Sequence, residues 1–483
     1  NKVIIDNYSV KVMLRDLYCP KCHTHHDNPQ TFLQCTVGGD ITIDCLKNLF
    51  SPALLLTTMS KSSVNMVFHA NVQINNTIIN NYDSNQVTSR NFGTFDEFPK
   101  NLFDHLDCDL RETMNQLCFN SLPGISYDVA EFCAQLMENK IIFVSNEWYE
   151  YNGSFWRNTK GPDRFIVKTI VPIYKKLSCH YTGNKSKWLM LLADDLGNST
   201  TRRRFVDDIR RILEDQSDMN DVKIDANPTL IGFQNGVFDT KTCTFVSHSP
   251  SDRLTKLLDY NLPTESDPVK RRDILQFFED IIPDAEVRTF LILYLSLHLG
   301  GRNEKQIAGI FTGSGGNGKG ILKNLMNVTF GHMHCEPTPA LLTSERPSDE
   351  RPAPNIVALK SKRSVFASEP EGNKKINSAV LKSLTGNDII RCRNCNSNDM
   401  VEFMPMFIPT LLCNAIPLFD GAENDVRAVW RRLLIIHFPM EFVDNPTMPH
   451  QKQIDTKLMD RLNTWAPEMM LILTEVYKDY VQG

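Results

Sequence analysis

Short apolar runs recur between helical patterns in the second half of this chain. Mostly apolar runs of five to seven residues stand at 307–312, 363–367, 407–413 and 433–438. Runs of this length bounded by turn residues are typical of buried strands, whereas longer periodic stretches favour helices. The pattern therefore predicts an α/β fold for this half, in which polar residues follow several of the strands.

The first half is more mixed. Residues 126–262 combine helical and strand patterns, with hairpin turns expected at 148–153 and 235–239. Strand candidates such as 64–72 occur in an Asn-rich stretch to which no chemistry can be assigned. From about residue 446 the apolar spacing predicts a helix to the end of the chain.

Composition narrows the class of protein. The 483 residues predict three or four domains, and the net charge of -5 excludes a uniformly basic nucleic-acid binder, although a ring or channel can still concentrate positive charge. The thirteen cysteines without a secretory signal suit a reducing, intracellular compartment. The apolar run 290–299 is too short to span a membrane and predicts a buried helix. Because the chain begins at Asn1 rather than Met, we expect sequence upstream of it.

A glycine-rich loop between a strand and a helix is the most informative motif. The letters GSGGNGKG follow the strand 307–312 and precede a helix expected to open at Ile321. In such a loop backbone N–H groups surround phosphates and Lys319 reaches the β- and γ-phosphate oxygens of a nucleoside triphosphate. The predicted nucleotide-binding residues are Gly313, Ser314, Gly315, Gly316, Asn317, Gly318, Lys319, Gly320 and Ile321. The alternative is a glycine-rich surface turn.

One position departs from the usual motif. Gly320 stands where Ser or Thr normally supplies a hydroxyl to Mg²⁺. A water molecule can replace that hydroxyl, which would weaken Mg²⁺ binding without necessarily abolishing turnover.

Polar residues follow two further strands. Glu369 and Glu371 come after the strand 363–367, an arrangement in which one carboxylate helps to hold Mg²⁺ and one polarises the attacking water. Asn414 follows the strand 407–413, where its amide can sense the γ-phosphate. Acids also follow strands for no functional reason, and that interpretation stays open for the two glutamates.

Arginines suggest contacts beyond one nucleotide. Arg427, Arg431 and Arg432 precede the strand 433–438, where an arginine is poorly placed for its own nucleotide but well placed for that of a neighbour, which predicts a ring. The alternative is a set of surface arginines flanking a strand.

A hairpin is predicted from residue 389 to residue 403. Its first strand places Arg391 and Arg393 on one face, and an Asn-rich tip at 394–398 can bind phosphate and sugar. The alternative is an ordinary solvated hairpin.

The N-terminal segment carries a candidate zinc site. Cys19, Cys22 and Cys35 are the safest ligands, and the fourth is Cys45 or His26. Such a site would be structural, because no position is left open for water. Free thiols beside surface histidines are the alternative.

The order of these motifs resembles superfamily 3 helicases, specifically the primase-helicase family of poxviruses and other large cytoplasmic DNA viruses. The sequence reads GSGGNGKG, SEPE, LKSLTGND, CNAIP and DVRAVWRRL in turn, with NGVFD upstream. The resemblance covers roughly residues 126–445. By analogy, the cysteine cluster looks like the zinc-binding end of a primase whose catalytic part would lie upstream.

The resemblance implies a hexameric AAA+-like ring that hydrolyses ATP between subunits and moves single-stranded or forked DNA through a pore. It assigns the phosphate-binding lysine to Lys319, the principal acid to Glu369 with Glu371 in support, and the sensor to Asn414. It places the arginine finger, the arginine that reaches the nucleotide of the neighbouring subunit, at Arg431 or Arg432. It places the contacts with DNA in the pore at Lys382, Arg391 and Arg393. Viral polymerase accessory factors are the implied partners, and the host cell cytoplasm is the implied location.

The implied organisation has five parts. They are a zinc-ribbon-like module (1–60), a connecting α/β segment (61–125), an α+β collar domain (126–262), the AAA+ core (263–445) and a truncated helical segment (446–483). Two other functions remain possible: a nucleotide-binding ring scaffold for replication or genome uncoating with weak hydrolysis, and a monomeric P-loop kinase. DNA-stimulated hydrolysis separates the helicase from the scaffold.

Overall fold

The computed structural model divides the chain into two compact units, residues 1–93 and 94–483. In the first unit it describes the backbone of seven strands. In the second unit it describes residues 95–483 except for 96–97, 100–101, 105, 107, 220–221, 344–351, 370–374, 394–399 and 422, and gives only the backbone of Cys108, Asp109 and Asp425.

The described part of the first unit is an antiparallel sheet and a small hairpin. The sheet has the order β1-β2-β5-β6-β7, and β3 pairs with β4. The strands are β1 (Lys2–Asp6), β2 (Ser9–Leu14), β3 (Tyr18–Cys19), β4 (Thr24–His25), β5 (Thr31–Thr36), β6 (Asp40–Cys45) and β7 (Leu54–Thr58). The candidate strand 64–72 lies outside the described residues.

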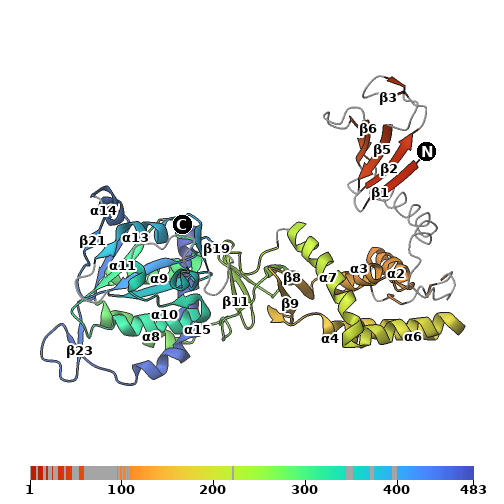
Figure 1. Cartoon of the computed structure of the whole chain (residues 1–483). Coiled ribbons are helices and arrows are strands. Elements are labelled where there is room, and N and C mark those ends of the chain that lie inside the picture. Colours follow the sequence, from red (N-terminus) through yellow and green to blue (C-terminus); the bar gives the residue numbers. More distant parts are fainter. Residues whose placement is uncertain are drawn as a thin grey trace. The chain divides into compact units, whose positions relative to one another are not determined.

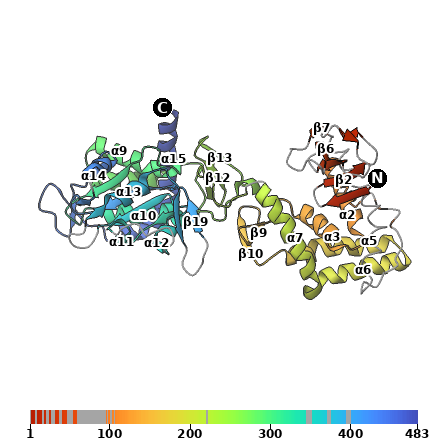
Figure 2. The same cartoon turned by 45° about the horizontal axis from the view of Figure 1, so that its top comes forward.

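The second unit begins with a group of helices that pack on one another (Figures 1 and 2). They are α2 (Cys108–Ser121), α3 (Ser126–Met137), α4 (Asp163–Phe165), α5 (Val171–His180), α6 (Gly183–Gly197) and α7 (Ser199–Met219), with a π-helical turn at Ile166–Ile170. The core of this group includes Phe132 and Tyr174, whose fully buried rings meet edge to face.

Two small antiparallel sheets accompany these helices. One contains β8 (Ile141–Val144), β9 (Glu147–Tyr151) and β10 (Trp156–Thr159), and the other contains β11 (Leu230–Phe233), β12 (Gly236–Asp239) and β13 (Thr244–Val246). Both predicted hairpins are confirmed, because β9 pairs with β10 and β11 pairs with β12. The mixture of helix and strand expected for 126–262 is therefore present.

A five-stranded parallel sheet forms the centre of the remaining chain. Its order is β15-β16-β20-β14-β22. The strands are β14 (Ala308–Thr312), β15 (His334–Cys335), β16 (Ser364–Ser368), β20 (Ile408–Leu412) and β22 (Leu433–His437). The four strands predicted from apolar runs are therefore confirmed within one or two residues, and the α/β fold class is correct for this region.

Helices and short strands surround this sheet (Figure 1). The helices are α8 (Pro268–Ile281), α9 (Ala285–Ser296), α10 (Lys319–Phe330), α11 (Ala340–Thr343), α12 (Pro354–Val357), α13 (Ser378–Thr385), α14 (Glu423–Trp430) and α15 (Leu458–Gln482). The short strand pairs are β17 (Ile376–Asn377) with β21 (Phe419–Asp420), β18 (Ile390–Arg393) with β19 (Met400–Phe403), and β23 (Glu441–Val443) with β24 (Gln451–Gln453).

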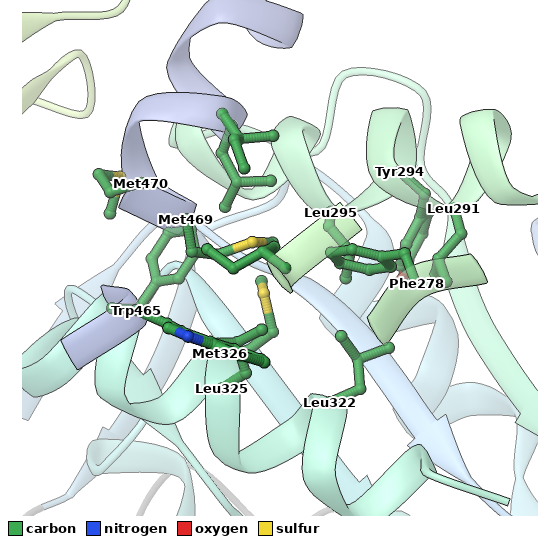
Figure 3. Close-up of a cluster of buried hydrophobic side chains, with 14 of the residues drawn as sticks. Phe278, Leu291, Tyr294, Leu295, Leu322, Leu325, Met326, Trp465, Met469 and Met470 are labelled. Atoms are coloured by element: carbon green, nitrogen blue, oxygen red, sulfur yellow. The ribbon is translucent and has the colours of Figure 1, made fainter. Parts of the chain in front are cut away.

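Alternating side chains of the sheet face two separate cores. Phe311 and Phe366 pack into a cluster with α8, α9, α10 and α15, whereas Ile310 and Val365 pack into a cluster with residues of α11 to α14. Figure 3 shows how Trp465 of α15 lies against Met326 of α10 in the first cluster. Because successive strand residues point to opposite faces, a strand buried on both faces reads as one continuous apolar run.

Two predicted boundaries are wrong. The helix after the glycine-rich loop begins at Lys319, two residues before Ile321. The C-terminal segment is not helical from about residue 446, because β24 precedes a helix that starts at Leu458. Since α15 packs on α8, α9 and α10, its apolar face belongs to the core around the parallel sheet. The finer domain boundaries stay predictions.

The apolar run 290–299 forms most of α9 and part of the 3-10 turn Leu297–Gly300. Leu291 and Leu295 are buried, while Phe290 is exposed. Across the described residues, no helix combines the length and the apolar character needed to cross a membrane.

Candidate nucleotide site

The glycine-rich loop connects β14 to α10 in a conformation that depends on its glycines. Gly318 has a φ of 81°, and a Cβ there would lie 2.5 Å from Ile281 Cγ2. A Cβ on Gly313 would lie 2.7 Å from the carbonyl oxygen of Phe438. Because heavy atoms cannot approach so closely, neither position accepts a side chain without movement of its neighbours.

The start of α10 leaves backbone donors for a ligand. Gly318 is the residue before the helix and provides no side chain to cap the first N–H groups. The first four N–H groups of a helix have no partner within the helix, and this end carries a partial positive charge. An anion is therefore favoured beside the loop.

Lys319 is turned across its own loop. Its Nζ donates to the carbonyl oxygen of Gly313 and to Oδ1 of Asn317, each at 2.9 Å, and its residue is only 7% exposed. Burial lowers the pKa of Lys319, and the nearby Cys413 and Glu369 oppose this shift. A triphosphate would supply stronger, charged acceptors for the same ammonium group.

Two polar groups from neighbouring strands meet beside the lysine. Glu369 follows β16 and Asn414 follows β20 after one residue, and Ser368 is paired with Leu412 at the ends of these strands. The backbone N–H of Asn414 donates to Oε2 of Glu369 at 2.8 Å. Since β20 lies between β14 and β16, both groups come to the same edge of the sheet as the loop. Glu371 lies outside the described residues.

A cavity of about 830 Å³ joins these groups. One end of it is lined by residues 315–321, Glu369 and Asn414, so the loop, the acid and the amide lie together in the fold. Its other walls come from α8, α10, the end of β20, and the chain from β23 to the start of α15: Phe277, Asn324, Leu412, Cys413, Phe442, Ile454, Asp455, Thr456, Leu458 and Met459. Sequence reasoning missed these walls, because no local motif marks them.

The environment of Gly320 is open. A Cβ at this position would meet no atom within 4 Å, so there is room for the side chain of Ser or Thr that the usual motif has here. Mg²⁺ prefers oxygen ligands, often one or two carboxylates together with substrate phosphates and water. Two described carboxylates line the cavity, Glu369 and Asp455. Asp455 pairs with Arg461, whereas Glu369 is exposed and accepts from the backbone of Asn414.

The candidate finger arginines do not line this cavity. Arg427 and Arg431 are exposed, whereas Arg432 donates to the carbonyl oxygen of Ala428 and to Oε1 of Gln306, each at 2.8 Å. They precede β22, while the cavity lies at the carboxyl ends of the parallel strands. That they are poorly placed for their own nucleotide stays a prediction. Of the two proposed fingers, Arg431 is the one that makes no side-chain hydrogen bond within the described part.

The predicted hairpin exists as β18 and β19. Arg391 and Arg393 lie on the same face of β18, because Ile390 and Cys392 alternate with them and are buried. Arg391 Nε lies 2.9 Å from Oε1 of Glu402 on the opposite strand. Lys382 lies on α13 and is half-buried. The Asn-rich tip lies outside the described residues.

Of the candidate zinc ligands, the structure describes only backbone. Cys19, Cys35 and Cys45 lie on β3, β5 and β6, but their side chains, and all of Cys22 and His26, lie outside the described residues. In the register of β5 and β6, Cys35 pairs with Ile41 and Cys45 with Thr31. Elsewhere, the described side chains form no group of three or more His, Cys, Asp or Glu that could hold a metal. The zinc site stays a prediction.

Residues 130–283 match the family described as "D5 N terminal like". This match begins within α3 and ends just after α8, so it stops before the glycine-rich loop. The match therefore covers most of the predicted collar domain (126–262) and continues through α8, which was assigned to the core (263–445).

Sequence relatives come from large DNA viruses. A protein of Acanthamoeba polyphaga mimivirus named as a putative helicase is 30% identical over 296 residues, which are 59% of this chain and 30% of that protein. A protein of Invertebrate iridescent virus 3, also named as a putative helicase, is 26% identical over 428 residues, which are 75% of this chain and 44% of that protein. A protein of African swine fever virus, named as a putative primase, is 24% identical over 298 residues, which are 60% of this chain and 29% of that protein.

The chain thus spans less than half the length of each of these relatives. The predicted similarity to helicases of large DNA viruses is confirmed, while the assignment to the poxvirus family stays a prediction. The A form apo structure of the NrS-1 C-terminal region is 16% identical and matches 50% of this chain and 65% of that chain at a TM-score of 0.31, too low for any conclusion about this chain.

Proposed function

We propose that this chain is an ATP-hydrolysing DNA helicase or translocase of viral DNA replication, built on an AAA+-like P-loop core of superfamily 3. One observation carries the proposal: Lys319, Glu369 and Asn414, which follow three adjacent parallel strands, line one cavity. These are a cation for phosphates, an acid for metal and water, and an amide for the γ-phosphate, which together are the parts that phosphoryl transfer requires.

The triphosphate would lie along the loop. The N–H groups at the start of α10 donate to its phosphate oxygens, and Lys319 exchanges Gly313 and Asn317 for the β- and γ-phosphates. Bound Mg²⁺ would neutralise phosphate charge, with Glu369 holding it directly or through water. Glu369, supported by Glu371, also polarises the attacking water, and Asn414 orients the γ-phosphate.

We further propose that the active unit is a homohexamer. Arg431 of one subunit would complete the cavity of its neighbour, because it is exposed and lies away from its own. A single DNA strand would pass Lys382, Arg391 and Arg393 in the central pore. A structural Zn²⁺ in the first unit, forked DNA and viral polymerase accessory factors as partners, and action in the host cell cytoplasm complete the proposal.

The test measures ATP hydrolysis with and without single-stranded DNA, together with oligomeric mass. We expect DNA to stimulate the native chain, and Lys319→Ala and Arg431→Ala each to lose hydrolysis while the oligomer remains intact. Absent hydrolysis, or hydrolysis indifferent to DNA and to Arg431, would refute the helicase proposal.

Mixing the two inactive variants tests whether sites are shared. In rings assembled from equal amounts, about one quarter of the interfaces pair an intact Lys319 with an intact Arg431 of the next subunit. Hydrolysis should therefore reappear on mixing. If each subunit carried its own complete site, the mixture would stay inactive.

The second candidate is a nucleotide-binding ring scaffold with weak hydrolysis. Two observations favour it: Gly320 lacks the metal-binding hydroxyl, and Lys319 is held by contacts within its own loop. Nucleotide binding without DNA-stimulated turnover would support the scaffold.

A further inference from the structure

A second cavity, of about 660 Å³, shares no lining residue with the nucleotide cavity. Its walls come from β8 and β9, the segment 223–227, β11, and the segment 254–256. The residues just before β15 and β16, and the end of β19 with the residues after it, complete them. Segments that are far apart in sequence therefore build it together.

The charges on this cavity are unbalanced. Its cationic residues are Lys223, Lys256, Lys360, Lys362 and Arg363, and its acidic residues are Asp225 and Glu402. Both acids are already engaged, since Asp225 accepts from the backbone N–H and hydroxyl of Thr255 and Glu402 pairs with Arg391. Within the described residues neither Lys256 nor Lys360 forms an ion pair. In the described part of the chain, Lys256 and Lys360 therefore form no ion pair with Asp225 or Glu402.

The crowding of positive charge is visible at Lys362 and His332. Lys362 is half-buried and donates one proton to the carbonyl oxygen of His332, which leaves two N–H donors. Burial lowers the pKa of Lys362, and the charge of Lys256 lowers it further. Burial also lowers the pKa of His332 to about 4, with Lys256 and Lys362 contributing and Asp259 opposing. A bound anion would relieve this repulsion.

Other walls of the cavity are aromatic and apolar. Tyr149, Phe403, Met404 and Met406 line it, and Met404 is 38% exposed. The hydroxyl of Tyr149 donates to Oε2 of Glu147 at 2.7 Å, which fixes one end of the ring. Cationic groups beside an aromatic platform are the combination that holds single-stranded nucleic acid, in which phosphates and base faces are both available.

The cavity is continuous with the hairpin that is predicted to contact DNA. Glu402 lines the cavity and at the same time pairs with Arg391 across β18 and β19. A strand lying along the hairpin could therefore extend into the cavity, which a small free anion would not require.

We propose that this cavity binds a single nucleic-acid strand, with phosphates on Lys256, Lys360 and Lys362 and a base against Tyr149. The inference rests on the proposed function for its ligand but concerns residues outside the nucleotide site and outside the hairpin. The other source of the same chemistry is a free phosphate compound, and the experiment separates the two.

The experiment measures the affinity of the full chain for a fluorescent oligothymidylate by anisotropy over a series of salt concentrations. The test variant is Lys256→Ala/Lys360→Ala, and its charge-matched control is Lys175→Ala/Lys176→Ala, on exposed positions of α5. Each lost phosphate contact should reduce the slope of log affinity against log salt by about 0.7, so the test variant should lose about 1.4 and the control nothing.

Tyr149→Ala tests the base contact separately. We expect at least about fivefold weaker strand binding with an unchanged salt slope, because stacking carries no charge. Mass spectrometry should also show that the strand protects Lys256 and Lys360, but not Lys175, from acetylation.

The outcomes are distinct. Native-like affinity and slope in the test variant, or equal acetylation with and without the strand, would overturn the cavity proposal alone. Weaker binding of inorganic tripolyphosphate by the test variant, with strand binding intact, would assign the cavity to a free phosphate compound and also overturn it. A native chain that binds no strand at any salt concentration would overturn the proposed function as well.

Discussion

Replacing Gly320 by serine restores the usual hydroxyl at a position with room for it. Gly320 is the second residue of α10, and a Cβ there meets nothing within 4 Å. Glycine in a helix is less favourable than alanine by about 1 kcal/mol and than serine by about 0.5 kcal/mol. We therefore expect Gly320→Ser and the control Gly320→Ala to fold and to raise the free energy of unfolding by up to these amounts.

The two variants should differ in Mg²⁺ dependence. If a water bridges the metal and the protein in the native chain, a serine hydroxyl that replaces it saves the cost of immobilising that water, which is at most about 2 kcal/mol. Taking half of this value, the Mg²⁺ concentration for half-maximal ATP hydrolysis should fall about fivefold in Gly320→Ser. Gly320→Ala adds the same Cβ without an oxygen, so its Mg²⁺ requirement should match the native one.

The assay titrates Mg²⁺ at fixed ATP for the three chains, with urea unfolding measured in parallel. Equal Mg²⁺ requirements in Gly320→Ser and Gly320→Ala would show that position 320 does not face the metal, and the proposed placement of the triphosphate on the loop would then be wrong. A loss of folding stability in both variants would contradict the open space beside Gly320.

Two further predictions concern the buried groups behind the sheet. Arg363 is buried and donates to the carbonyl oxygens of Leu299 and Leu230. Arg363→Met should therefore lower the free energy of unfolding, measured in urea, by about 3 kcal/mol or more. The control Arg302→Met, at an exposed position, should change it by less than about 0.5 kcal/mol. Burial lowers the pKa of His298 from its usual 6.5 to about 4, so the folded chain binds fewer protons than the unfolded chain between these values. The stability that this neutral histidine contributes above pH 6.5 is lost as the pH falls towards 4, and His298→Gln should show a smaller drop in urea midpoint between pH 7 and pH 5. An equal drop in both chains would contradict this assignment.

Local patterns were enough to predict the strands of the central sheet. Strand β14 is buried at all five positions, and an apolar run of that length between turn residues has few other structures available. The same reasoning failed at 446–457, where Ile454 stands at near-helical spacing from Leu458 but precedes the helix. Ile454 is exposed and lines the nucleotide cavity instead of continuing the apolar face of α15. Periodicity records which residues are apolar and not what they pack against.

Which residues meet at the candidate nucleotide site was predictable in part. The loop, Glu369 and Asn414 each follow a strand, and parallel strands bring their carboxyl ends to one edge. Spacing could not show that Lys319 donates to Asn317, that Arg432 donates to Gln306, or that Phe442 lines the cavity. Each depends on a partner brought close by the fold.

The sequence by itself determined where backbone freedom and charge are available: glycines where φ must be positive or a neighbour comes close, and acids and amides after apolar strands. These properties are local, because they follow from the steric and hydrogen-bonding limits of a few consecutive residues. The tertiary structure alone decided which strands are neighbours, and therefore which polar groups share a cavity. It also decided that Lys256, Lys360 and Lys362 line one cavity with His332. Such groupings come from the packing of distant segments around common cores, and no short stretch of sequence contains that information.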